Sequence, residues 1–162
     1  MFPHYKIGPE ARKYFEIAYE NQMSGHFDRA IHYYKKSLRI EPTAEGYTFL
    51  GWTYSLVGKF RMAIMQCKKA ISYDPDFGNP YNDIGSYLMQ MGLLNEAIPW
   101  LQKAKKVTRY SNPEFPYCNL GRLYERKGLW PLAYIEYQRA AALNSDHAPA
   151  VESLQRLAAR LN

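Results

Sequence analysis

The side chains that could do catalytic or metal chemistry are few in this chain and lie far apart. The two cysteines, Cys67 and Cys118, have no metal or redox spacing and are expected to be free thiols in a reducing compartment. Each glycine stands alone, so no glycine-rich loop is available to cradle a phosphate. The histidines have no partner one helical turn away; they are His4, His26, His32 and His147. We therefore expect no catalytic residues, no cofactor and no metal site.

Basic side chains recur at a regular spacing and could meet phosphates or an acidic surface. The recurring residues are Lys36, Lys69, Lys103 and Arg139, reinforced by Lys35, Lys68, Lys105 and Lys106. This basic column has no stacking platform of its own for nucleic-acid bases. A solvated outer face is therefore the main interpretation, and nucleic-acid or acidic-surface binding is the alternative.

Composition places the chain among ordinary globular proteins. Its 162 residues can form a domain with its own core, and a net charge of +6 permits acidic partners without requiring them. Aromatic residues are frequent, at 15%, and 15 of them are tyrosines. No apolar run approaches the roughly 20 residues that span a bilayer, and the start of the chain lacks the apolar core of a secretory signal. These features predict a cytoplasmic location and no membrane span.

Four copies of one pattern must position all of these side chains. The copies follow one another at offsets of 33, 34 and 36 residues and begin at Ala11, Ala44, Gly78 and Glu114. Position 15 of every copy is glycine: Gly25, Gly58, Gly92 and Gly128. Position 20 is always alanine: Ala30, Ala63, Ala97 and Ala133. Apolar residues on both sides of the glycine recur at helical spacing, which predicts two helices per copy.

Local signals predict where these helices begin and end. The glycine suits a left-handed residue that closes the first helix. Asp28 and Asn95 are expected to cap the second helix, and Pro42 and Pro75 to stop it. One such hairpin buries too little apolar surface alone, so the copies are expected to stack on one another.

The pattern divides the chain into a leader, an array and a last helix. We expect an extended N-terminal leader at 1–10 and a C-terminal capping helix at 148–162, whose apolar stripe includes Leu154 and Leu157. Binding of a membrane or a partner helix is the alternative for that stripe. The repeats between them are expected at 11–43, 44–77, 78–113 and 114–147, which together make up 11–147.

This pattern resembles the tetratricopeptide repeat, a helix-turn-helix unit of 34 residues. The signature of aromatic, Leu, Gly, Tyr, Gly, Ala, Ala and Pro recurs in register over roughly residues 11–145. The resemblance implies an all-α, right-handed superhelix (α-solenoid) of four hairpins plus the capping helix. Asn21 departs from the family by standing where an aromatic residue is usual. The join 108–113 carries two extra residues, so a local irregularity is expected there.

In this family the first helices line a concave groove that receives partners. The family positions imply a groove that is aromatic at its N-terminal end, rich in amides in the middle and cationic at the far end. The implied groove residues are Phe15, Tyr19, Thr48, Trp52, Asn82, Ser86, Asn119, Arg122 and Arg126. In the alternative, Phe15 and Trp52 pack inside the array and the amides are merely solvated.

The family's two-carboxylate clamp, which grips the acidic C-termini of chaperones, is absent. Its positions need lysine and asparagine in one repeat, asparagine in the next, and lysine and arginine in the third. Started from the first repeat, they hold Phe15, Tyr19, Phe49, Asn79 and Asp83; started from the second, they hold Thr48, Trp52, Asp83, Phe115 and Asn119. We expect no chaperone C-terminus to bind in this way.

The sequence thus predicts a non-enzymatic protein–protein interaction module or scaffold that binds a peptide or helix of a partner in the concave groove. Binding of nucleic acid or an acidic surface through the basic convex face is the alternative. Repeat faces could also stack end to end between copies, but a monomer is favoured because the last helix carries a charged face.

Overall fold

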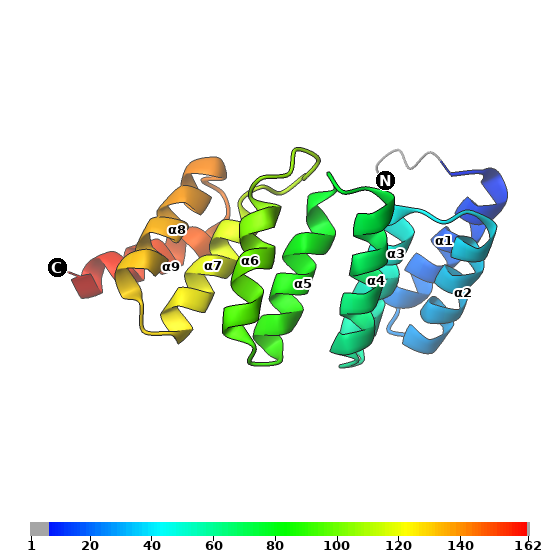
Figure 1. Cartoon of the computed structure of the whole chain (residues 1–162), viewed down its shortest axis with the longest axis horizontal. Coiled ribbons are helices and arrows are strands. Elements are labelled where there is room, and N and C mark those ends of the chain that lie inside the picture. Colours follow the sequence, from blue (N-terminus) through cyan, green and yellow to red (C-terminus); the bar gives the residue numbers. More distant parts are fainter. Residues whose placement is uncertain (1–6, 162) are drawn as a thin grey trace.

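Helices make up all the regular structure of the described chain. The computed structural model describes residues 7–161, so the first six residues of the predicted leader lie outside it. The helices are α1 (Pro9–Met23), α2 (Phe27–Ile40), α3 (Ala44–Leu56), α4 (Phe60–Tyr73), α5 (Gly78–Gln90), α6 (Leu94–Ala104), α7 (Phe115–Arg126), α8 (Trp130–Leu143) and α9 (Ala148–Leu161). They form four consecutive hairpins followed by α9 (Figure 1). No helix of the described part is long and apolar enough to cross a membrane.

The hairpins are arranged in two layers. First helices contact one another along the array, α3 with α5 and α5 with α7, and each second helix packs on the first helix of the following hairpin. The first helices are therefore the inner, concave layer of the all-α right-handed solenoid. The second helices form the outer, convex layer, and α4 lies in front of α3 in Figure 1.

The turn inside each hairpin is closed by a left-handed glycine, as predicted. These glycines have φ between 72° and 80° and are Gly25, Gly58, Gly92 and Gly128. In the first repeat, the backbone N–H of His26 then donates to the carbonyl oxygen of Asn21 at 2.8 Å, which is the longer hydrogen bond of a Schellman turn. The same pairing recurs in every hairpin.

The predicted N-caps were wrong, and this turn explains why. Because it fixes the backbone up to the residue after glycine, each second helix begins two residues after the glycine whatever side chain stands there. Helix α2 begins after His26 and α6 after Leu93, without a side-chain cap. Asp28 lies inside the first turn of α2, and the side-chain oxygen Oδ1 of Asn95 instead accepts a hydrogen bond from Lys127 Nζ of the next repeat.

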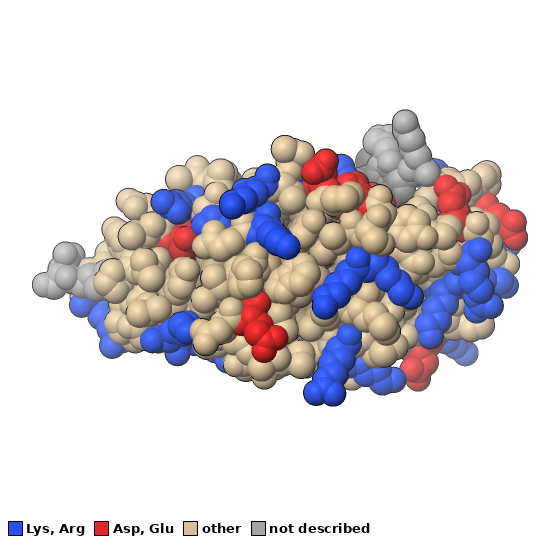
Figure 2. Space-filling model, viewed as in Figure 1, with Lys and Arg blue, Asp and Glu red and all other residues tan. Residues whose placement is uncertain are grey.

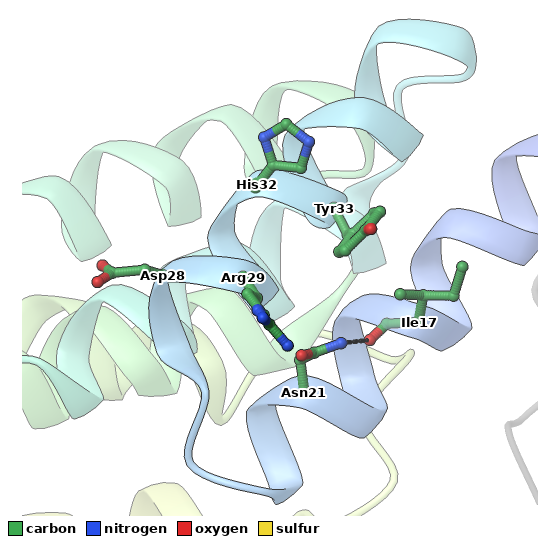
Figure 3. A pocket seen from close by; sticks show the side chains of 6 residues that line it. All are labelled: Ile17, Asn21, Asp28, Arg29, His32 and Tyr33. Carbon is green, nitrogen blue, oxygen red and sulfur yellow. Dashed lines mark hydrogen bonds between the residues drawn. The ribbon is translucent and has the colours of Figure 1, made fainter.

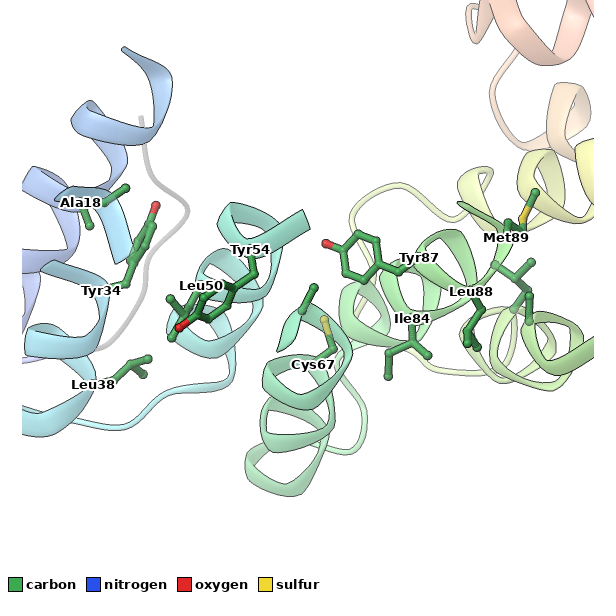
Figure 4. Packing of buried hydrophobic residues seen from close by; sticks show 14 of the residues in the cluster. Ala18, Tyr34, Leu38, Leu50, Tyr54, Cys67, Ile84, Tyr87, Leu88 and Met89 are labelled. Carbon is green, nitrogen blue, oxygen red and sulfur yellow. The ribbon is translucent and has the colours of Figure 1, made fainter. Parts of the chain in front are cut away.

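Small residues let the two helices of a hairpin approach closely. A Cβ atom on Gly85 would lie 2.5 Å from Leu101, and one on Gly121 would lie 2.7 Å from the Tyr137 ring. The opposing side chains are fully buried. One apolar cluster runs from α1 to α7, part of which is drawn in Figure 4, and a second joins α7, α8 and α9.

The expected irregularity between the third and fourth repeats is a loop that folds back across the second and third. The Arg109 backbone pairs with the chain around Phe77, and its guanidinium lies 4.2 Å from the Phe77 ring. That guanidinium also forms ion pairs with Glu45, at 2.8 Å, and with Asp74. The Tyr110 ring packs where a side chain on Gly78 would otherwise lie. The extra residues thus tie neighbouring repeats together.

A buried ion pair joins the third and fourth repeats. Lys105 Nζ donates to both carboxylate oxygens of Glu136, at 3.1 and 3.0 Å, and the two side chains are only 11% and 8% exposed. The same ammonium group lies 4.3 Å from the Tyr117 ring centroid. Two desolvated charges are tolerated here because each neutralises the other.

Lys105→Met is expected to lower the free energy of unfolding by up to about 3 kcal/mol. The buried Glu136 would keep only its longer contact with the exposed Arg139, at 3.8 Å. The double variant Lys105→Met, Glu136→Met should recover much of that loss. Urea denaturation followed by circular dichroism measures both, with Lys106→Met at the exposed neighbouring position as the control. A loss no larger than that of the control would show that the pair contributes nothing at this junction.

Candidate functional site: the concave groove

A row of aromatic rings forms the N-terminal part of the inner layer. The Phe49 ring of α3 lies 5.2 Å from Phe15 and 5.9 Å from Tyr19, both on α1. The Trp52 ring, about one turn further along α3, lies 5.9 Å from the Phe49 ring. Phe15 is buried, Tyr19 is partly buried, and Trp52 is 38% exposed. Packing thus holds the row in place and leaves Trp52 as its most exposed ring.

Beside this row, Gln22 carries a buried polar group that is only half satisfied. Its carbonyl oxygen accepts hydrogen bonds from the hydroxyls of Tyr34 at 2.8 Å and Thr53 at 3.1 Å. Its amide nitrogen has no hydrogen-bond partner in the described structure, although the residue is only 3% exposed. A buried donor without an acceptor costs stability. Gln22 stands at a family position that faces the groove, but it was not among the predicted binding residues; its polar type at that position was the available signal.

The amides in the middle of the groove pair with each other across two repeats. Asn119 Nδ2 donates to Asn82 Oδ1 at 2.9 Å, which links α7 to α5. Asn82 is buried, while Asn119 and Ser86 are partly exposed. Thr48 is also buried, and its hydroxyl donates to the Ala44 carbonyl oxygen of its own helix at 2.8 Å. Asn119 and Ser86 therefore offer more accessible polar atoms than Asn82 and Thr48.

The far end of the groove is cationic. Arg126 donates to the Met89 carbonyl oxygen at 2.7 Å and so bridges the third and fourth repeats. Arg122 is exposed and has no ion-pair partner among the described residues. The neighbouring carboxylate of Glu125 pairs with Arg156 of α9 at 2.7 Å. Arg122 is thus placed to receive a negative group.

Asp83 is a titratable residue of the inner layer that sequence reasoning did not select. Burial raises the pKa of its carboxyl to about 7, and a hydrogen bond with Asn82 opposes the shift only in part. Burial also raises the pKa of the Cys67 thiol and of the Tyr87 and Tyr110 hydroxyls around it. The Asp83 carboxyl therefore gains and loses its proton near neutral pH. Its type and position gave no sign of this, because the shift depends on how tightly the repeats pack.

A separate pocket of about 590 Å³ lies between α1 and α2. Asn21 donates to the Ile17 carbonyl oxygen at 2.7 Å in its wall, and Asp28 points away from the other lining residues (Figure 3). Among the described residues no group of three or more His, Cys, Asp or Glu side chains is placed to hold a metal ion. The pocket is open because Asn21 is smaller than the aromatic residue that is usual at its position in the family.

A sequence model of the tetratricopeptide repeat matches residues 10–43, 44–77 and 79–110, which is more than half of the chain. The chain belongs to the tetratricopeptide repeat family. The hairpin of α7 and α8 has the same turn and the same small residues, although it lies outside the matched segments. Arrays of this family are generally non-enzymatic interaction modules, which supports a protein–protein interaction scaffold here.

Solved structures resemble the whole array. The crystal structure of MamA has a TM-score of 0.74 at 27% identity, and the match covers 93% of this chain and 82% of that one. PilF of Pseudomonas aeruginosa has a TM-score of 0.84 at 21% identity, covering 93% and 69%. PilW, a type IV pilus biogenesis factor, has a TM-score of 0.81 at 19% identity, covering 93% and 70%. The likeness to PilF and PilW concerns the fold alone.

The raised pKa of Asp83 makes stability depend on pH. The unfolded carboxyl has a pKa of 3.8 and the folded one about 7, so the stability that its proton confers is present below the unfolded value and lost as the pH rises through the folded value. We expect Asp83→Asn to change the free energy of unfolding little at pH 4 and to raise it by roughly 2–4 kcal/mol at pH 8. Urea denaturation at both pH values measures this. Asp146→Asn at an exposed position is the control for loss of a charge, and an equal effect of both variants would contradict the assignment.

Proposed function

We propose that this chain is a scaffold that binds a peptide or helix of a partner protein along its concave groove. The exposed ring of Trp52 is the observation that carries the proposal. A large aromatic side chain that protrudes from a packed row presents apolar area at little cost in conformational entropy, which is typical of binding hot spots. Its neighbour Phe49 holds it at a fixed place on α3.

The rest of the groove supports a partner with an apolar anchor and an acidic group further along. Ser86 and the carbonyl oxygen of Asn119 can hydrogen-bond to a partner backbone, while Arg122 can pair with a carboxylate. Because the Asn82–Asn119 hydrogen bond and the Arg126 contact are already formed, the surface is largely preorganised, which lowers the cost of binding.

The predicted groove residues take two roles in this proposal. Tyr19, Trp52, Ser86, Asn119 and Arg122 contact the partner. The four residues that position this surface from beneath or between repeats are Phe15, Thr48, Asn82 and Arg126. The proposal includes no chaperone clamp and retains the predictions of a monomer and a cytoplasmic location.

Trp52→Ala is expected to weaken partner binding at least tenfold, about the effect of losing an aromatic hot spot. Its partner would first be identified by affinity capture from nuclease-treated source lysate and mass spectrometry, then titrated against the purified variants. Tyr73→Ala is the matched control because Tyr73 is an exposed aromatic residue on the outer helix α4. Circular dichroism should show all variants folded.

Equal affinity of the Trp52→Ala variant and the native chain would move the binding site out of this groove. A partner that is captured from untreated lysate but lost after nuclease treatment would instead support nucleic-acid binding.

A further inference from the structure

The outer layer has a pocket of about 370 Å³ at the seam between the first and second repeats. It lies between α2 and α4, and side chains of α3 form part of its lining. Leu38 and Leu50 contribute apolar lining, as do Met62 and Met65, which are 37% and 43% exposed. We name it the seam pocket. Methionine side chains are flexible and polarisable, so they adapt to varied apolar groups.

A difference in residue type at one repeat position explains why this seam is open. Gln66 lines the seam pocket at position 23 of the second repeat, and the same position in the third repeat is Trp100. Trp100 reaches across the next seam: its ring lies 5.8 Å from Lys68 Nζ of α4 and 6.2 Å from the Tyr81 ring of α5. The larger ring occupies at that seam the space that glutamine leaves open here.

The charged residues lining the seam pocket are all basic: Lys35, Arg39 and Lys69. The ammonium group of Lys35 lies 5.8 Å from the Tyr54 ring centroid, and that of Lys69 lies 5.6 Å from the Tyr47 ring centroid. Lysine and arginine side chains gather over α2 and α4 in Figure 2. A lysine ammonium group lies over each of these tyrosine rings, so the rings are poor platforms for stacked bases. An apolar floor under a cationic rim is complementary to an acidic amphipathic chain.

We propose that the seam pocket is a second binding site, which takes an acidic amphipathic helix of a partner protein. An apolar side chain of the helix enters between α2 and α4, and its carboxylates pair with Lys35, Arg39 and Lys69. This use of secondary structure is the helix-in-groove mode of recognition. The site lies on the outer layer and is independent of the function proposed for the concave groove.

The test uses the whole chain and a fluorescent peptide of about 18 residues, with leucine on one helical face and glutamate on the other. Gln66→Trp fills the pocket with the side chain that the third repeat already uses, and it removes no charge. We expect it to weaken peptide binding at least tenfold. Lys35→Ser with Arg39→Ser should also weaken binding, whereas Lys13→Ser with Lys106→Ser, which removes the same charge elsewhere, should not. Trp52→Ala should leave this binding unchanged.

Several results would overturn the proposal. If Gln66→Trp binds the peptide like the native chain, the peptide does not enter the seam pocket. If the two charge variants lose affinity equally, the peptide is attracted only by net charge. Loss of binding in Trp52→Ala would place the peptide in the concave groove. Tighter binding of an oligothymidine strand or of phosphatidylserine vesicles, with the same sensitivity to Gln66→Trp, would assign the pocket to another class of partner. Thermal melts of each variant ensure that only folded protein is compared.

Discussion

The close approach of the two helices in each hairpin is the constraint on which the rest of the structure depends. Leu101 and Tyr137 pack so tightly on Gly85 and Gly121 that a Cβ atom has no room there. Since the contact sets the distance between the layers, the hairpins repeat one geometry and their stacking closes a continuous core. Positions that this contact does not restrict are free to differ between the repeats.

Position 23 shows how one such difference changes the chemistry of a seam. In the first repeat it is Tyr33, whose ring stacks on Tyr14 with centroids 6.2 Å apart. Gln66 leaves a pocket in the second repeat, and Trp100 spans the seam in the third. In the fourth repeat Glu136 forms the buried ion pair with Lys105. The same position thus holds a stacked tyrosine, a glutamine beside an open pocket, a tryptophan that fills a seam and a glutamate in an ion pair, because only its side chain differs.

The sequence was sufficient for the fold because the fold depends on short-range periodicity. The glycine at position 15 predicted the turn and the spacing of apolar residues predicted two helices per copy, and both are present in all four hairpins. Features that depend on contacts between distant residues were missed. The link from Arg109 to Glu45 spans two repeats, and the raised pKa of Asp83 needs the burial that stacking produces. For the same reason, the sequence gives the positions of the candidate site residues through the helical period, but it does not give their exposure, as the burial of Phe15 and Thr48 illustrates.

The inner layer is also where the described structure is least satisfied. Gln22 keeps a buried amide donor without an acceptor, and Asp83 keeps a desolvated carboxyl with only a partial opposing hydrogen bond. Both residues lie on first helices, which face the concave side, and both oppose the stability gained by packing. In the outer layer, lysine side chains instead lie against aromatic rings: the ammonium group of Lys36 is 4.1 Å from the Tyr14 ring centroid. The basic column therefore also stabilises the array, whereas the unpaired amide donor of Gln22 and the buried carboxyl of Asp83 reduce its stability.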